Sequence, residues 1–246
     1  MSAYIYDHSF HDYTAKLNWL SAGRVVSLIL SMTQVRSVLD VGCSVGHWLN
    51  RWREAGVEDH LGLDGDYVER TALVIDKQRF IPTDLSAPFS LGRRFDFVTC
   101  LEVAEHLPET RAAGLVKDLT DHGDLVLFSA APPGQGGENH INEQPYTYWR
   151  DLFAARGYVL IDCVRPLAAW FSDVAPWYRQ NTFLFASPAG MERLPPIAQH
   201  YVLADDQPIR DVSPLLYRIR KAIIRQLPFS ATQFLARAKA RWGRKG

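Results

Sequence analysis

The chain has few cysteines, no long apolar run and no excess of charge of either sign. Its three cysteines, Cys43, Cys100 and Cys163, are too few and too scattered for a disulfide framework or a four-cysteine zinc site, which is typical of a reducing compartment. No stretch reaches the roughly 18 uninterrupted apolar residues of a membrane-spanning helix, and residues 1–10 lack the basic and apolar segments of a secretion signal. We therefore expect a cytoplasmic protein.

Charge is balanced over the whole chain but not along it. The 27 Lys and Arg residues equal the 27 Asp and Glu residues, so the molecule as a whole gives no electrostatic reason to bind nucleic acid. Residues 209–246 nevertheless contain ten Lys or Arg and a single acid, Asp211. Apolar residues at helical spacing within 214–227 predict a basic amphipathic helix. Such a helix can pack on the fold, contact the inner membrane face peripherally or bind RNA phosphates, and these alternatives stay open.

Short apolar runs alternate with helix-like stretches through the middle of the chain. We interpret seven runs as strands, at 35–41, 60–63, 79–83, 95–101, 124–129, 158–164 and 182–186, and three stretches as helices, at 47–55, 108–120 and 145–156. The alternation through the first five strands predicts an α/β fold with a doubly wound parallel sheet. The last two strands have no convincing helix between them, so we expect an antiparallel hairpin at one edge.

This pattern divides the 246 residues into three parts. We expect a catalytic domain at 35–187, an N-terminal helical cap at 1–34 and a basic, mostly helical extension at 188–246. The length suffices for one α/β domain with an appendage, but is short for two independent cores.

Acidic residues and glycines follow the first three predicted strands. Asp40, Gly42 and Gly46 lie in the segment VLDVGCSVG, where a strand turns into a helix and the backbone can approach a ligand closely. The G-x-x-x-G spacing lacks the third glycine of a dinucleotide loop, and Asp40 would repel a diphosphate but suits a cationic ligand with an amino group. Asp64 and Asp84 end the next two strands, and Asp64 can accept hydrogen bonds from ribose hydroxyls. The carboxylates thus line the crevice where open α/β sheets bind ligands.

Four segments in order, VLDVGCSVG, GLDGD, TDL and FDFVTCLEVAEHLP, resemble the motifs of class I S-adenosylmethionine-dependent methyltransferases. The resemblance covers roughly residues 35–187 and implies a Rossmann-like seven-strand fold with S-adenosylmethionine as cofactor. It also implies that Asp40, Gly42, Cys43 and Gly46 hold the methionine part, Asp64 with Gly65 the ribose, Asp84 with Leu85 the adenine, and that Glu102 faces the methyl-transfer site. Ser44 replaces the commoner glycine, and it carries strain if its φ angle is positive.

Two histidines are candidates for the base that an acceptor hydroxyl needs. His106 follows the predicted fourth strand, and His140 lies in the long polar loop PPGQGGENHINEQ after the fifth. We expect this loop to cover the acceptor, and we assign both histidines and Glu143 as catalytic because histidine titrates near neutral pH. Glu143 and Asn139 are the candidates to orient the imidazoles. The alternatives are a packed helix-face histidine for His106 and a solvated loop residue for His140.

The same residues suggest a second interpretation, a metal site. Glu102, Glu105 and His106 lie within one helical turn, and His140 would complete a set of oxygen and nitrogen ligands for magnesium or manganese. This arrangement is similar to that of the metal-dependent small-RNA terminal 2′-O-methyltransferases. The E-x-x-E-H-x-P pattern also occurs in methyltransferases that need no metal, so our prediction assigns no metal ligand and keeps the ion as an alternative.

The acceptor is inferred from the segments around the predicted core. Aromatic residues at positions 170, 171, 177 and 178, beside 179–181, suit stacking on a sugar ring or form an apolar loop packed on the fold. The stretch from GLDGDYVERT to PWYRQN resembles bacterial methyltransferases of surface-polysaccharide and secondary-metabolite biosynthesis. The resemblance implies O-methylation of a sugar hydroxyl in a polysaccharide or glycosylated metabolite, with a small-molecule or glycan acceptor. The alternatives are a metal-dependent RNA ribose 2′-O-methyltransferase and a non-catalytic cofactor-binding protein.

Overall fold

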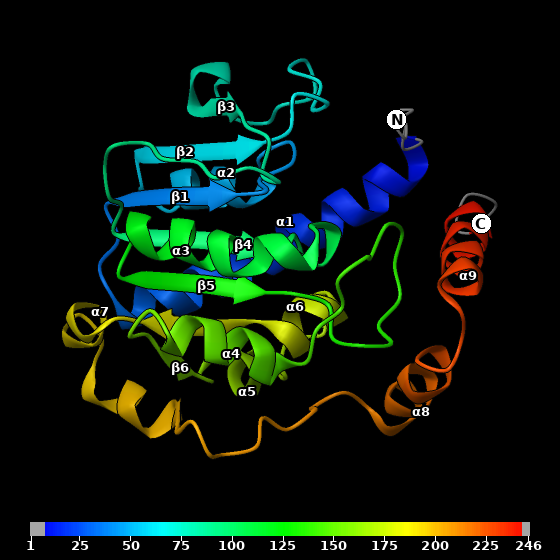
Figure 1. Ribbon diagram of the computed structural model, residues 1–246. Coiled ribbons are helices and arrows are strands. Elements are labelled where there is room, and N and C mark those ends of the chain that lie inside the picture. The colour runs from blue at the N-terminus through cyan, green and yellow to red at the C-terminus, as the bar shows by residue number, and fades with distance from the viewer. Residues whose placement is uncertain (1–7, 243–246) are drawn as a thin grey trace.

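The computed structural model describes residues 8–242 of the chain. Within that range, eight strands form one sheet in the order β3-β2-β1-β4-β5-β7-β6-β8, with helices on both faces (Figure 1). The strands are β1 (Ser37–Val41), β2 (Asp59–Asp64), β3 (Phe80–Pro82), β4 (Phe97–Leu101), β5 (Leu125–Ser129), β6 (Val159–Ile161), β7 (Phe183–Ala186) and β8 (Val202–Leu203).

The α-helices are α1 (His8–Met32), α2 (His47–Glu54), α3 (Ala112–His122), α4 (Tyr146–Ala154), α5 (Val164–Ala168), α6 (Pro176–Asn181), α7 (Pro188–Glu192), α8 (Leu215–Ile224) and α9 (Phe229–Trp242). In the part of the chain that the structure describes, four short 3₁₀ helices accompany them, namely η1 (Lys77–Arg79), η2 (Ala104–His106), η3 (Glu109–Arg111) and η4 (Pro196–Tyr201).

The first five strands are parallel, as predicted. β1 pairs with β2 and with β4, β2 pairs with β3, and β4 pairs with β5, all in parallel register. Every residue of β4 and β5 is buried, because helices cover both faces of the sheet. Strands buried on both faces appear in a sequence as continuous apolar runs, which is why these strands could be recognised. The parallel strands end at one edge, where the site lies.

The sheet departs from the prediction on its other side. β7 lies between β5 and β6 and is antiparallel to both, so the expected hairpin exists, but its second strand is the inner one. Two short helices, α5 and α6, connect β6 to β7, where the sequence indicated no helix. β8, from the predicted extension, adds an eighth strand antiparallel to β6. These elements are too short to produce a recognisable period.

Two apolar layers enclose the sheet. On one face α1, α2 and α5 pack against it, and Trp52 of α2 is fully buried 5.4 Å from Phe97, measured between ring centroids. On the other face α3 and α4 do the same, and Phe153 of α4 stacks on Phe185 at 3.8 Å. Since α1 belongs to the first layer and β8 to the sheet, both flanking parts pack on the domain. The boundaries at 34 and 187 themselves remain predictions.

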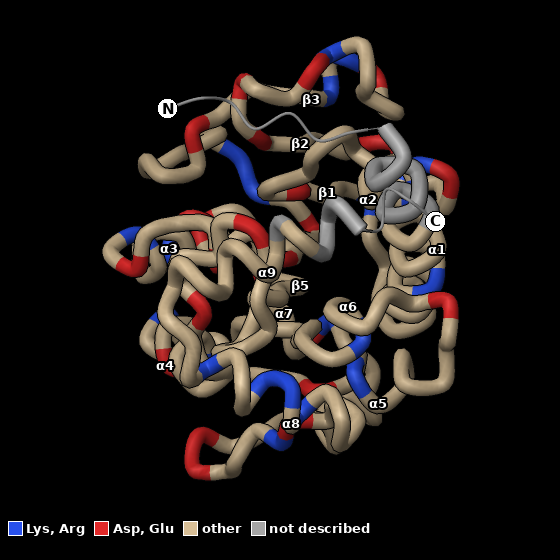
Figure 2. The backbone as a smooth tube through the Cα atoms, turned by 90° about the vertical axis from the view of Figure 1, so that its right-hand side faces the viewer, with Lys and Arg blue, Asp and Glu red and all other residues tan. Residues whose placement is uncertain are grey.

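The end of the chain returns to the carboxyl edge of the sheet. After β8 it runs along the lower side of the molecule and ends in α8 and α9, which lie beyond the ends toward which the parallel strands point (Figures 1 and 2). The predicted helix at 214–227 corresponds to α8, and α9 follows it. Within the described range, no helix combines the length and the apolar character needed to cross a membrane.

Candidate active site

The turn after β1 requires glycine at Gly42. Its φ angle is 82°, and a Cβ atom there would lie 2.2 Å from Cγ2 of Val103, so no other residue fits without displacing Val103. Gly46, which begins α2, has a φ angle of 91°. Ser44 has a φ angle of 50°, so it carries the strain that a side chain has in the left-handed region. Cys43 packs its side chain inward over Gly62, and only its backbone remains for a ligand in this turn.

Asp40 is a buried carboxylate that lacks one hydrogen-bond donor. It is 3% exposed, and its Oδ1 accepts a hydrogen bond of 2.5 Å from the Thr99 hydroxyl. Its Oδ2 has no partner among the described residues. Burial raises the pKa of Asp40 to about 7. The hydrogen bond from Thr99 partly offsets this increase, and the negative charge of Asp64 adds to it. A buried oxygen without a donor is costly, and the amino group of a cationic ligand would satisfy it.

The raised pKa of Asp40 predicts a pH-dependent affinity for a cationic ligand. Below pH 7 the free protein holds Asp40 protonated, and an ammonium group favours the carboxylate, so binding must release a proton. We expect the affinity for S-adenosylmethionine to fall by up to about tenfold per pH unit below 7 and to level off above it. Titration calorimetry between pH 5.5 and 8.5 measures this, and Asp40→Asn should remove the dependence.

The raised pKa of Asp40 also makes the stability of the folded protein depend on pH. Because its folded pKa is raised, the Asp40 carboxyl group contributes stability that is complete below its unfolded pKa and is lost as the pH rises through about 7. Asp40→Asn should therefore raise the melting temperature at pH 8 more than at pH 5. An equal effect at both pH values would contradict the raised pKa.

Asp64 links the turn after β1 to the turn after β2 through hydrogen bonds. It lies at the end of β2, where its Oδ2 accepts a hydrogen bond of 2.6 Å from the Ser44 backbone N–H. Its Oδ1 accepts from the Gly65 N–H at 2.7 Å and from the Tyr67 hydroxyl. A Cβ atom on Gly65 would lie 2.0 Å from the Tyr67 ring, so glycine allows Tyr67 to lie over this turn. A carboxylate accepts about four hydrogen bonds, so a ribose hydroxyl can still be added here.

Asp84 and Leu85 follow β3 and differ in exposure. The carboxylate of Asp84 is exposed and accepts hydrogen bonds from the Ser86 N–H at 2.9 Å and the Ser86 hydroxyl at 2.6 Å, which lower its pKa. Leu85 is 8% exposed and packs in the core. Asp84 thus caps a turn at the expected edge, and its contact with adenine remains a prediction.

Glu102 is held in a strained conformation at the end of β4. Its φ angle of 56° lies in the left-handed region, which non-glycine residues adopt mainly where the surroundings enforce it. Its carboxylate accepts hydrogen bonds from Gln135 at 2.8 Å and from Asn181 at 3.2 Å. Asn181 also donates to Gln135 and accepts from the Tyr146 hydroxyl. The sequence could not reveal this network, because its members come from four separate segments.

The predicted catalytic residues meet beside this network. Nδ1 of His140 lies 2.9 Å from Oε1 of Glu143. Oε1 also accepts a hydrogen bond from the Gly136 N–H, and Oε2 accepts one from the Gly134 N–H, at 2.7 Å each. The rings of His106 and His140 contact edge to face, with centroids 4.9 Å apart. Glu143 therefore orients His140. It also joins the start of the loop after β5, at Gly134 and Gly136, to the end of that loop. Asn139 takes part through its backbone, whose N–H donates to Gln233 of α9.

The sequence and the fold both resemble those of known proteins. Residues 20–130, which include β1 to β5 and the carboxylates Asp40 and Asp64, match the model of a family described as a methyltransferase domain. The chain is a class I S-adenosylmethionine-dependent methyltransferase. A ubiquinone biosynthesis O-methyltransferase of Alkalilimnicola ehrlichii is 27% identical over 199 residues, which cover 74% of this chain and 73% of that protein.

Solved structures agree with the methyltransferase fold. The sugar N-methyltransferase KedS8 of a Streptoalloteichus species superimposes with a TM-score of 0.55 at 17% identity, over 76% of this chain and 95% of that one. The methyltransferase domain of a bacterial protein, CtHen1-C, does so with a TM-score of 0.52 at 21% identity, over 70% of this chain and 98% of that one. At these identities the likeness concerns the fold alone.

Part of the alternative metal site is also present in this methyltransferase. Glu105, His106 and His140 each place one ligand atom within 4.8 Å of the others, and both carboxylate oxygens of the buried Glu105 lack a partner among the described residues. The pKa of Glu105 is raised well above its usual value, mainly by burial and also by the nearby charge of Glu102. The pKa of His106 is lowered to about 4, mainly by burial and also by the neighbouring His140. Unpartnered oxygen and neutral imidazole donors fit a divalent ion. Glu102, bound to its amide partners, lies outside this group.

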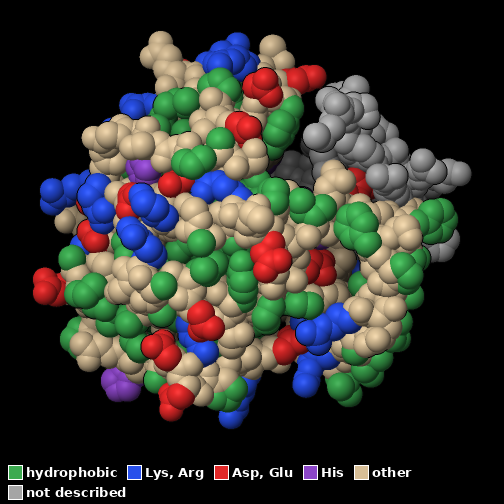
Figure 3. Space-filling view, viewed as in Figure 1, with side chains coloured by type: hydrophobic (Ala, Val, Ile, Leu, Met, Phe, Trp, Pro, Cys, Tyr) green, Lys and Arg blue, Asp and Glu red, His purple; other side chains and the backbone are tan. Residues whose placement is uncertain are grey.

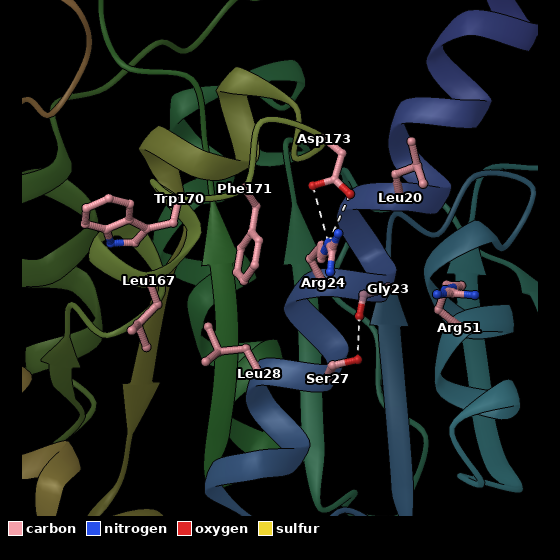
Figure 4. A pocket seen from close by; sticks show the side chains of 10 residues that line it. All are labelled: Leu20, Gly23, Arg24, Ser27, Leu28, Arg51, Leu167, Trp170, Phe171 and Asp173. Atoms are coloured by element: carbon pink, nitrogen blue, oxygen red, sulfur yellow. Dashed lines mark hydrogen bonds and ion pairs between the residues drawn. The ribbon is translucent and has the colours of Figure 1, made fainter.

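The aromatic residues of the methyltransferase do not form the single platform that the sequence suggested. Trp170 is 87% exposed, and together with Phe171 it lines an open cavity of about 560 Å³ against α1 (Figure 4). Figure 4 also shows the ion pair of Arg24 and Asp173 in this cavity. Tyr178, in contrast, is buried and packs on Trp48 of α2. The cavity is lined by none of the predicted site residues. Of the two alternatives for these aromatic residues, the structure favours apolar residues packed on the fold over a single sugar platform.

Proposed function

We propose that the enzyme transfers the methyl group of S-adenosylmethionine to a sugar hydroxyl, in a polysaccharide or a glycosylated metabolite, with His140 as general base. The observation that carries this is the contact of 2.9 Å between His140 Nδ1 and Glu143. A hydrogen on Nδ1 directed at the carboxylate leaves Nε2 as the proton acceptor, and the imidazolium that forms is stabilised by Glu143. Burial and the neighbouring His140 lower the pKa of His106 to about 4, which makes His106 a poor base.

The order of the strands in the sheet supports the roles proposed for these residues. Asp64 ends β2, Asp40 lies near the end of β1, and Glu102 follows β4, which separates β1 from β5 in the sheet. The loop with His140 follows β5, on the side of β1 opposite Asp64. A cofactor with its ribose at Asp64 and its amino group at Asp40 would therefore direct its methyl group toward Glu102 and the loop. Holding donor and acceptor in line is a large part of catalysis in such a transfer.

Polar groups around Glu102 support a polyhydroxylated acceptor. The amides of Gln135 and Asn181 are hydrogen-bonded to each other and to Glu102, and the Tyr146 hydroxyl donates to Asn181. Gln135 belongs to the loop that carries the proposed base. Such groups suit hydrogen bonding to hydroxyls, whereas a flat aromatic acceptor would be better held between rings. An aliphatic hydroxyl also needs a base during transfer, which matches the paired His140 and Glu143.

An acceptor panel tests this proposal. Formation of S-adenosylhomocysteine would be measured with methyl glycosides and nucleotide sugars, with catechols, and with an RNA oligonucleotide that ends in a free ribose. We expect turnover with a sugar, loss of turnover with the deoxy sugar that lacks the modified hydroxyl, and an O-methyl signal in the product by NMR. Turnover restricted to catechols or to RNA would contradict the sugar assignment.

Metal-assisted methylation of an RNA ribose is the second candidate, and the group of Glu105, His106 and His140 favours it. These three residues would hold a divalent cation, which when bound would polarise the acceptor hydroxyl, and Glu143 would be the outer partner that orients His140.

Chelation separates the two candidates. If His140 acts as a base, activity should survive excess EDTA. His106→Ala should then lower turnover less than His140→Ala does, because the lowered pKa of His106 makes it a poor base. If the metal acts, EDTA should abolish activity, manganese or magnesium should restore it, and the two variants should be similarly impaired. We expect the first pattern, with cofactor affinity by calorimetry unchanged in both variants.

A further inference from the structure

The C-terminal helices direct their apolar side chains away from the protein. In α8 the outward residues are Leu215, Leu216, Ile219 and Ile223, with exposed fractions of 69%, 81%, 48% and 59%. In α9 they are Phe229, Phe234 and Leu235, exposed at 56%, 72% and 47%. We call these seven residues the apolar face. Amphipathic helices of soluble proteins usually have the opposite orientation, with the apolar side inward.

Polar contacts fix α8 in this orientation. Lys221 is 5% exposed, and its Nζ lies 2.6 Å from the Asp211 carboxylate and 2.9 Å from the Ser213 hydroxyl. Arg220 donates a hydrogen bond of 2.8 Å to the backbone carbonyl of Gln135. Rotating the helix to bury Ile223 would separate the buried Lys221 ammonium group from Asp211, whose side chain is 34% exposed. This is costly because it leaves the Lys221 charge without its partner. The outward orientation is therefore built into the fold.

α9 is attached in the same way. Gln233, 9% exposed, accepts a hydrogen bond from the Asn139 N–H at 3.0 Å and donates to the Gly137 carbonyl at 3.3 Å. Both helices thus use polar groups to bind the loop that carries His140. In the space-filling view, apolar side chains follow the outer edge of the molecule where the C-terminal helices lie in Figure 1 (Figure 3).

We propose that the apolar face is a docking surface for an anionic lipid bilayer, on which α8 and α9 lie in the plane of the membrane interface. The excess of positive charge around the apolar face favours an anionic bilayer as its partner. Arg218 of α8 and Arg225, the C-cap of that helix, are exposed. Residues 209–246 contain ten Lys or Arg and a single acid, Asp211, which is already paired with Lys221. Basic residues beside a continuous apolar stripe are the signature of interfacial helices. A second copy of the chain would instead bring two basic surfaces together.

Docking would place the active-site loop next to the membrane. The loop is bound to α8 through Gln135 and to α9 through Asn139, so both helices lie between the acceptor side of the site and the lipid. An acceptor with a lipid anchor would meet the enzyme at this edge. That consequence rests on the proposed function, whereas the docking itself does not.

Vesicle flotation of the full-length protein tests the proposal. We expect binding to vesicles of phosphatidylcholine with phosphatidylglycerol at low salt, weaker binding at high salt, and little binding to pure phosphatidylcholine. Leu216→Glu combined with Ile223→Glu should lower binding by about tenfold or more, and so should Arg218→Glu combined with Arg225→Glu. Ile197→Glu is the matched control, because Ile197 is an isoleucine 56% exposed on η4, and it should bind like the wild type.

Other outcomes would overturn the proposal. These are no flotation at any salt, equal loss in the Ile197→Glu control, binding to an RNA oligonucleotide without binding to vesicles, or a dimer by light scattering that Leu216→Glu with Ile223→Glu dissociates. Thermal melting and calorimetric affinity for S-adenosylmethionine should be unchanged in all variants, since every altered side chain is exposed. These readouts need no acceptor, so a failed acceptor assignment would not affect them.

Discussion

His140→Ala is expected to lower turnover by roughly 10²- to 10⁴-fold while leaving the affinity for S-adenosylmethionine unchanged. The variant removes the proton acceptor but none of the groups of the β1 and β2 turns that form the cofactor crevice. Turnover would be measured as S-adenosylhomocysteine formed at saturating acceptor, and affinity by calorimetry.

Glu143→Gln provides a matched control for the role of the pair. It keeps the size of the side chain but removes the charge that stabilises the imidazolium, so turnover should fall. His106→Ala changes the neighbouring ring and should have a smaller effect if no metal acts. Full activity in His140→Ala would remove His140 from the mechanism.

Asp64→Ala is expected to weaken S-adenosylmethionine binding by on the order of 1.5 to 3 kcal/mol, because it removes a charged acceptor from the ribose hydroxyls. It also releases the Ser44 and Gly65 N–H groups, which Asp64 holds at 2.6 and 2.7 Å, so the glycine turn loses part of its order. Both effects act on the cofactor, and calorimetry measures their sum.

Asp66→Ala is the control for this variant, because Asp66 is an exposed aspartate two residues away. It should bind the cofactor like the wild type. Melting curves of both variants would show whether Asp64→Ala remains folded. If the folded variant binds S-adenosylmethionine with unchanged affinity, the assignment of the crevice is wrong.

The fold and the position of the strand-end carboxylates could be predicted because their signals are local. Residues of β4 and β5 form unbroken apolar runs, and Asp40 and Asp64 lie at strand ends that parallel strands bring to one edge. The pairing of His140 with Glu143 was within reach because the two residues are three positions apart in one loop.

Other features depend on contacts between remote segments. The sequence indicates an amphipathic helix near 214–227, but not that its apolar side faces outward, because this depends on Lys221 meeting Asp211 and on Arg220 meeting the Gln135 carbonyl. The network around Glu102 has the same origin. The separation of Trp170 from Tyr178 follows from α6, whose six residues are too few to show a period.

A crystal structure of the enzyme with S-adenosylhomocysteine bound is the most direct test of the assigned cofactor crevice. We expect the ribose hydroxyls on the Asp64 carboxylate, the amino group near Asp40 and the sulfur directed toward Glu102 and the loop that carries His140. A product bound elsewhere, for example in the cavity between α1 and Phe171, or a sulfur directed away from that loop, would contradict it.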